Sequence, residues 1–115
     1  MWHGIVVDAA FDVNFFRSLK IIGKKESEGW ILAKIEVPDW NVEAYANAIQ
    51  SAMKKKFYSH LYSDKGDLMV IFKKKIFRLK SDKATWKPAV EYGKSIGIPD
   101  EQLDFFPCRF EDETY

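Results

Sequence analysis

The feature that most constrains the fold is that alternate side chains between Phe57 and Lys80 sort into one apolar face and one mixed face. Side chains that alternate with a period of two occupy the two faces of a β-strand, whereas a helix needs a period of 3.6. Two turn-like interruptions, Asp64-Lys65-Gly66 and Lys74-Lys75, divide the stretch into three segments. The stretch therefore predicts a meander of three antiparallel strands.

Burial of one face fixes the expected register of this meander, because directly opposed residues share a face. Pairing Tyr62 with Asp67, and Lys73 with Ile76, gathers seven apolar residues and one serine on one face. This predicted core face consists of Phe57, Ser59, Leu61, Leu68, Val70, Phe72, Phe77 and Leu79. Lys-Lys is a poor two-residue turn, so the register depends on burial alone.

The first third of the chain also indicates strands. Residues 4–8 predict a short strand, while residues 9–19 fit either a helix or a strand and are left open. Residues 19–25 and 30–37 predict a hairpin around the turn at Glu26–Gly29. In its second arm, Ile31, Ala33, Ile35 and Val37 alternate with Trp30, Leu32, Lys34 and Glu36.

Two helices follow from apolar stripes. The first stripe runs from Val42 to Met53, with Asp39 or Asn41 as its cap and Lys54–Lys56 in its last turn. The second helix is expected over residues 85–96, capped by Thr85 and ended by Gly97, with Pro88 in its first turn.

At 115 residues, the chain is expected to form a single domain. We predict an α+β fold over residues 1–110, with an antiparallel sheet of about five strands and two main helices on one face. A ferredoxin-like arrangement requires residues 105–110, which are expected to be extended, to pair as a fourth strand. Residues 111–115 are expected to form a mobile acidic tail.

Charge is segregated along the chain although the net charge is only +1. Residues 1–53 carry a net charge of −2, residues 54–94 carry +8, and residues 95–115 carry −5. The runs Lys54–Lys56 and Lys73–Lys75 are expected at the same end of the sheet, as a cationic rim for phosphate groups or for the acidic tail. A solvated face is the plainer interpretation of the same charges.

The single cysteine, Cys108, allows no disulfide within the chain, which fits a reducing compartment. The longest apolar run, Leu68–Phe72, is far too short to span a membrane. Asp8 and Asp12 interrupt the apolar stretch that a signal peptide would need. We therefore expect a cytoplasmic protein with no membrane partner, and no sequence pattern predicts a metal or a cofactor.

The second face of the predicted sheet is unusually apolar and aromatic for a solvated surface. We predict it as a binding surface, with six candidate residues: Trp30, Tyr58, His60, Tyr62, Met69 and Arg78. Three occupants are compatible with it, namely the amino-terminal segment, a second copy of the chain, or a ligand. The sequence favours a binding or interaction domain that forms a homodimer through this face.

Two other functions are compatible with the same residues. Stacking of bases on Tyr or Trp, with Arg or Lys on phosphates, predicts single-stranded nucleic-acid binding. A small enzyme would use His60 with a carboxylate such as Asp67 or Glu36, and requires a pocket at His60 and a shifted pKa. A histidine hydrogen-bonded to a tyrosine or to backbone is the simpler expectation, and Cys108 is more simply a buried apolar residue than a nucleophile.

Overall fold

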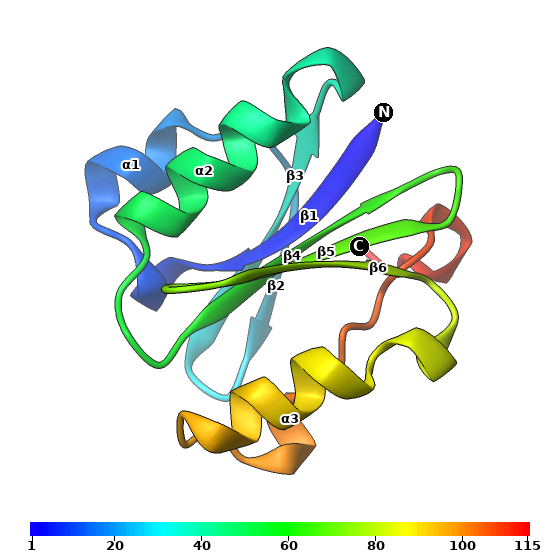
Figure 1. The fold of residues 1–115 in the computed structure, drawn as a ribbon. Coiled ribbons are helices and arrows are strands. Elements are labelled where there is room, and N and C mark those ends of the chain that lie inside the picture. Colours follow the sequence, from blue (N-terminus) through cyan, green and yellow to red (C-terminus); the bar gives the residue numbers. More distant parts are fainter.

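A computed structural model describes all 115 residues of the chain. Its strands and main helices follow the order β1, α1, β2, β3, α2, β4, β5, β6, α3 (Figure 1). The strands are β1 Trp2–Val7, β2 Ile21–Ser27, β3 Trp30–Val37, β4 Tyr58–Ser63, β5 Asp67–Phe72 and β6 Ile76–Lys80. The helices are α1 Val13–Ser18, α2 Val42–Ala52 and α3 Lys87–Ser95, with five short 3-10 turns between and after them.

All six strands form one open antiparallel sheet in the order β2-β3-β1-β4-β5-β6. The predicted α+β class and antiparallel sheet are confirmed, with six strands and three helices rather than about five and two. β1 lies in the middle of the sheet, between β3 and β4. It therefore joins the β2–β3 hairpin and the β4–β5–β6 meander into one sheet.

The predicted hairpin of β2 and β3 is present, and its turn is tighter than expected. Ser27 pairs with Trp30, which leaves Glu28 and Gly29 as a two-residue turn. Both have positive φ values, 52° and 85°, as the tight turns that suit twisted antiparallel strands require. The ambiguous residues 9–19 form a 3-10 turn and α1, which Asp12 caps by accepting from the Phe15 backbone N–H.

The predicted register between β4 and β5 is wrong by one residue. Tyr62 pairs with Leu68, not with Asp67. The Ser63 hydroxyl accepts hydrogen bonds from the backbone N–H groups of Lys65 and Asp67, both at 3.1 Å, so the turn takes up one more residue. Because side chains alternate, this shift puts Tyr58, His60 and Tyr62 on the same face as Leu68, Val70 and Phe72.

The register between β5 and β6 differs from the prediction by two residues, which preserves the faces. Ile71 pairs with Ile76 and Val70 with Phe77. The turn is formed by Lys73 and Lys74, because Phe72 and Lys75 exchange backbone hydrogen bonds of 2.8 and 3.4 Å. Phe77 and Leu79 therefore share the face of Val70, as predicted.

The prediction that both main helices lie on one face of the sheet is wrong. Figure 1 shows α1 and α2 on one side of the sheet and α3 on the other. Val42, Ala46 and Ile49 of α2 pack with one core cluster, which includes Val6, Ala33, Ile35, Leu61, Met69 and Ile71. Trp86 and Ala89 pack with a second cluster, which includes Ile5, Tyr62, Leu68, Val70, Phe72, Leu103 and Phe105. Both faces of the sheet are therefore apolar enough to need cover.

Close packing of the central strand depends on a glycine. A Cβ at Gly4 would lie 2.3 Å from Leu61 Cδ2 and 3.2 Å from the His60 carbonyl oxygen. Its strand neighbours Ile35 and Leu61 are fully buried, so there is no open space for the extra atom. Only glycine fits here without displacing the strands.

Both main helices begin or end differently from the prediction. α2 ends at Ala52, so Lys54–Lys56 lie beyond it instead of in its last turn. Thr85 does not cap α3, because its hydroxyl instead bonds the backbone of Lys80 and Asp82 in the preceding turn. Helix α3 starts at Lys87, two residues later than predicted, while Pro88 lies near its start and Gly97 follows its end, as expected.

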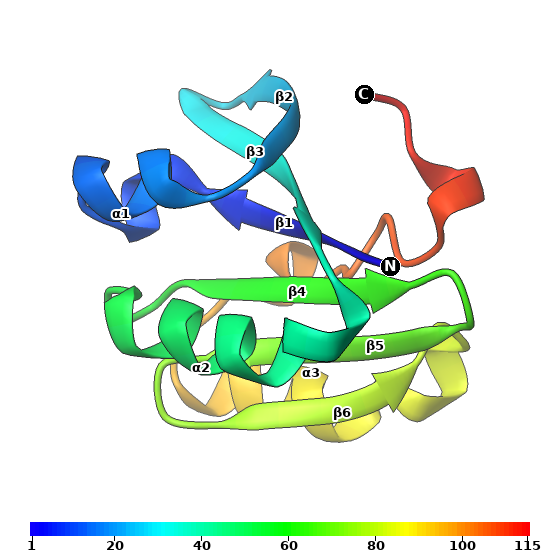
Figure 2. The ribbon, with the colours of Figure 1, turned by 90° about the horizontal axis from the view of Figure 1, so that it is seen from above.

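Residues 105–110 do not form a strand, so the condition for a ferredoxin-like arrangement is not met. This segment crosses the α3 side of the sheet, and its carbonyl groups bond side chains instead of a strand edge. Pro107 has no N–H to give to a ladder. Figure 2 shows the chain running from α3 past the sheet toward the side of β1 and β3. No helix is both long enough and apolar enough to cross a bilayer.

Candidate functional site: a pocket beside His60

A pocket of about 390 Å³ lies on the α3 side of the sheet, where β1, β3 and β4 meet the segment after α3. Its apolar walls come from the sheet and from residues 98–106. The side chains that matter most are Ile5, Trp30, Leu32, Tyr58 and Phe106, together with His60. Trp30 is 40% exposed and Phe106 is 51% exposed, so the two rings border the opening of the pocket.

His60 lies in the middle of β4 and is only 4% exposed. Its Nε2 lies 2.8 Å from the carbonyl oxygen of Pro107. A carbonyl can only accept, so Nε2 carries the proton and Nδ1 has the free lone pair. The simpler sequence expectation, a histidine hydrogen-bonded to backbone, is confirmed.

Burial controls the charge of this ring. Desolvation lowers the pKa of His60 from 6.5 to about 4, although the Pro107 carbonyl and Asp104 act in the opposite direction. The ring is therefore neutral at physiological pH. No hydrogen bond reaches Nδ1 from the protein, and no fully buried side-chain nitrogen or oxygen lacks a partner. Nδ1 is therefore not fully buried and has no partner in the protein, and His60 is among the residues that line the pocket.

Tyr58 connects the sheet to the opposite wall. Its hydroxyl donates to the carbonyl oxygen of Gln102, and the carbonyl oxygen of Asp104 lies 3.4 Å away. Burial raises the pKa of Tyr58, and the nearby Asp104 carboxylate adds to this effect. The phenol therefore stays protonated and holds residues 102–104 against β4.

The polar rim of the pocket is mostly acidic. Glu28, Glu101 and Asp104 line it, against a single cation, Lys56. None of these four side chains takes part in an ion pair within the chain. Such a rim favours neutral or cationic ligand groups over anionic ones.

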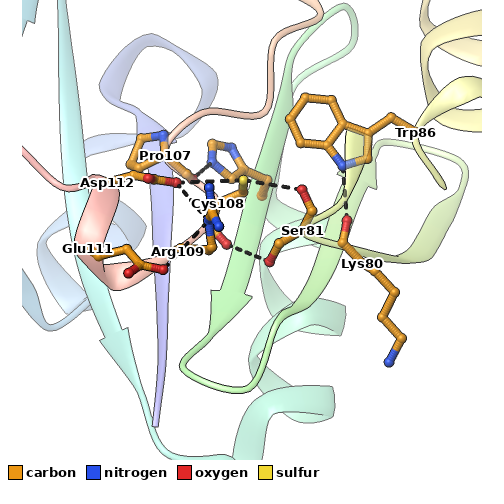
Figure 3. A network of polar contacts seen from close by, with 9 residues as sticks. Lys80, Ser81, Trp86, Pro107, Cys108, Arg109, Glu111 and Asp112 are labelled. Carbon is orange, nitrogen blue, oxygen red and sulfur yellow. Dashed lines mark hydrogen bonds and ion pairs between the residues drawn. The ribbon is translucent and has the colours of Figure 1, made fainter. Parts of the chain in front are cut away.

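The segment that closes the pocket is itself held by polar contacts (Figure 3). The Ser81 hydroxyl donates to the Cys108 carbonyl oxygen at 3.0 Å, and the Trp86 indole N–H donates to the Lys80 carbonyl oxygen at 2.9 Å. Arg109 lies 3.5 Å from Asp112. The Ser81–Cys108 hydrogen bond ties the residue after Pro107 to the residue that follows β6, while the Arg109–Asp112 contact lies within the segment.

A second anchor lies further along the same segment. Glu113 accepts hydrogen bonds from Tyr62 at 2.6 Å and from His3 at 2.5 Å, and its other oxygen lies 3.3 Å from the Lys34 amine. Burial acts to raise the pKa of Glu113, but the hydrogen bonds from Tyr62 and His3 outweigh it and lower the pKa. Glu113 therefore contacts the sheet through His3, Lys34 and Tyr62, while the mobility expected of residues 111–115 stays a prediction.

The six candidate binding residues do not share one surface. Trp30, Tyr58 and His60 line the pocket, and Tyr62 lies on the same face but is fully buried beneath Glu113. Met69 and Arg78 lie on the other face, since Leu61 pairs with Met69 and Met69 with Arg78. Met69 is buried in the core beneath α2, and Arg78 pairs with Glu43 of α2 at 2.5 Å.

The carboxylates expected to assist His60 are paired elsewhere. Asp67 binds Lys80 at 2.6 Å, and Glu36 binds Lys20 at 2.5 Å. Cys108 is buried, and burial raises the pKa of its thiol, with Asp112 adding to the effect. A buried, protonated thiol does not act as a nucleophile. The expectation of no metal and no cofactor stays a prediction.

Sequence reasoning missed the wall formed by residues 98–106, including Phe106 and the carboxylates of Glu101 and Asp104. Periodicity gives no signal for this segment, since it contains no main helix or strand. An exposed phenylalanine next to proline is the only local hint.

The fold and the pocket define an open antiparallel α+β domain with a partly enclosed, aromatic cavity on one face of its sheet. Compared with known proteins, the chain matches no family model, no curated protein and no solved structure.

Proposed function

We propose that this chain is a binding domain for a small organic molecule, held in the pocket beside His60. The observation that carries the proposal is a neutral histidine that lines an apolar cavity and whose Nδ1 has no partner in the protein. The volume of about 390 Å³ falls within the range of roughly 300–1,000 Å³ that ligand pockets occupy.

The chemistry of the pocket selects the ligand. Trp30 and Phe106 offer flat apolar surfaces that lose little conformational freedom on binding. Nδ1 of His60 accepts a hydrogen bond, so the ligand carries an N–H or O–H donor. The acidic rim disfavours a carboxylate at the same place. A neutral or cationic aromatic ring with one donor satisfies all three requirements.

The two alternative functions from the sequence fit less well. Stacking of single-stranded bases needs an open sheet face, and α3 and residues 98–115 lie over the face that contains Tyr58 and Tyr62. Catalysis by His60 has the expected pocket and a shifted pKa, but a pKa of about 4 makes a weak base at neutral pH. Binding is therefore preferred.

The homodimer predicted from the sequence stays a prediction, and light scattering over a range of concentrations tests it. Ile71→Lys would not test the dimer, because Ile71 is fully buried in the α2-side cluster and the substitution would disrupt the core. A cytoplasmic location is kept as part of the proposal because of the single, buried cysteine.

The test of the binding function compares indole with 1-methylindole, which lacks the N–H donor, by NMR chemical-shift titration. We expect indole to shift resonances of Trp30, His60 and Phe106, and to bind about fivefold more tightly than 1-methylindole, as one net hydrogen bond provides. Trp30→Ala should weaken indole binding by about tenfold, since it removes one aromatic wall.

Trp40→Ala is the matched control, because Trp40 is 84% exposed and does not line the pocket. It should leave indole binding unchanged. Equal losses in the two variants, or shifts spread over the molecule without a maximum at the pocket, would contradict the proposed function. Equal affinity for the two probes would remove the assigned role of His60.

A further inference from the structure

The two lysine runs meet in space, as the sequence predicted. Lys55 and Lys56, which follow α2, and Lys73 and Lys74, which form the β5–β6 turn, line a common pocket of about 240 Å³. Its remaining walls are apolar and come from Phe57, Tyr92 and Ile96. The pocket thus combines four cations with a flat and an aliphatic surface at one end of the molecule.

The charge of this pocket is not balanced within the chain. None of its four lysines, nor the neighbouring Lys54 and Lys75, takes part in an ion pair, although eleven ion pairs exist elsewhere. Lys73 donates to the carbonyl oxygens of Gln50 and Ser51 at the end of α2, at 3.2 and 2.7 Å. The amines of Lys55, Lys56 and Lys74 have no partner in the protein.

The acidic segment at residues 111–115, the one occupant within the chain that the sequence suggested, does not fill the site. Glu113 bonds His3, Lys34 and Tyr62 on the sheet, and Asp112 lies beside Arg109. The acidic segment therefore leaves the exposed amines of Lys55, Lys56 and Lys74 open to an anion from outside the chain.

The backbone at Lys56 adopts an unusual conformation. Lys56 has a φ of 70°, in the left-handed region that costs a residue with a side chain roughly 1 kcal/mol or more. Glycine would occupy this position without that cost. Lys56 therefore combines a costly backbone conformation with a position in the lining of the cationic pocket.

We propose that this pocket binds the phosphate group of a small phosphorylated ligand, whose organic part lies against Phe57, Tyr92 and Ile96. Lysine amines bind phosphate as point charges without a fixed fork geometry. The site is distinct from the His60 pocket, although Lys56 and Phe57 border both, and it does not require the proposed function to be correct.

Titration calorimetry and NMR shifts with three probes test the site: adenosine diphosphate, inorganic pyrophosphate and adenosine. Adenosine diphosphate should bind most tightly, pyrophosphate more weakly because it lacks the ring, and adenosine most weakly. Shifts should be largest at Lys55, Lys74 and Tyr92. Raising the salt concentration from 50 to 300 mM should weaken both phosphorylated probes severalfold.

The double variant Lys55→Gln/Lys74→Gln changes two residues that line this pocket and not the His60 pocket, and should weaken adenosine diphosphate binding at least tenfold. Lys24→Gln/Lys25→Gln removes the same charge from exposed positions on β2, at the opposite edge of the sheet, and should change affinity less than twofold. Lys56→Gly should weaken binding without loss of stability, because it relieves the backbone.

Equal losses in the two double variants would show attraction to net charge only and would overturn the proposal. So would tighter binding of a single-stranded oligonucleotide or of anionic phospholipid vesicles through the same lysines. The outcome is separable from that of the His60 pocket, since His60→Gln should not affect adenosine diphosphate and the Lys55/Lys74 variant should not affect indole.

Discussion

At the scale of single residues, His60 shows what a sequence can and cannot say about a titratable group. Its position between two tyrosines on one strand face follows from alternation, and so does its partial burial. Its partner, the Pro107 carbonyl, lies 47 residues further along the chain in a segment without periodicity. The pKa of His60 is lowered by burial beneath this segment, and this burial could not be predicted from the sequence.

The buried, neutral His60 predicts a specific dependence of stability on pH. Its pKa is about 4 in the folded protein and near 6.5 when unfolded, so the unfolded chain binds the proton first as pH falls. Stability attributable to His60 is present above pH 6.5 and is lost between there and pH 4, by roughly 3 kcal/mol in total.

Urea unfolding between pH 7 and 4 checks this prediction against His60→Gln, which keeps an N–H for the Pro107 carbonyl and does not titrate. Other carboxylates also lower stability in acid, so the relevant quantity is the difference between the two proteins. A difference that does not change between pH 7 and 4 would show that His60 titrates normally.

At the scale of elements, the sequence largely predicted which strands and helices are present. It did not predict the register in which neighbouring strands pair. Every predicted strand up to Lys80 and both main helices are present, because hydrophobic periodicity reports burial directly. Register depends on turn chemistry, and the Ser63 hydroxyl adds one residue to a turn that burial alone placed differently. Alternation then moves His60 and Tyr62 to the face of Val70, and with them the candidate site.

The segment from Phe105 to Tyr115 is held to the sheet mainly by side-chain contacts, and Glu113 is the most enclosed of its carboxylates. Glu113→Gln should lower the free energy of unfolding by about 1–3 kcal/mol at pH 7, since the half-buried carboxylate that bonds Tyr62, His3 and the Lys34 amine loses its charge and Lys34 keeps only the Tyr115 oxygen. Its lowered pKa means that this contribution is present above pH 4.5 and is lost as pH falls through the folded-state pKa.

Glu111→Gln is the control for this carboxylate, because Glu111 is exposed and lies 3.7 Å from the exposed Arg109. Exposed pairs of this kind contribute about 0–1 kcal/mol. Chemical unfolding at pH 7 and hydrogen exchange over residues 105–115 provide the measurements. Equal, small effects of the two substitutions would mean that Glu113 does not anchor the segment.

At the scale of the whole molecule, the sequence predicted the α+β class but not the two-sided sheet. Because the predicted register between β4 and β5 was off by one residue, one face of the sheet was expected to be mixed and open. In the structure both faces are apolar and covered. With the observed register the flat binding surface does not exist. In its place is a smaller, partly enclosed pocket where β1, β3 and β4 meet residues 98–106. The meeting of the lysine runs was predictable, because it depends on which end of a strand each run occupies.

Two cores separated by a sheet predict that substitutions on opposite faces act independently. Ile49 of α2 and Val90 of α3 pack with different clusters, so Ile49→Val and Val90→Ala should be additive within about 0.5 kcal/mol. Helices sharing one face would have common neighbours and would couple. Ile49→Val with Ile71→Val, both in the α2-side cluster, is the reference pair and should show coupling of about 0.5 kcal/mol or more. Urea unfolding of the single and double variants measures both couplings. Coupling between Ile49 and Val90, with none between Ile49 and Ile71, would mean that α2 and α3 do not lie on opposite faces of the sheet. The placement of residues 98–106 as a wall of the His60 pocket would then be wrong as well.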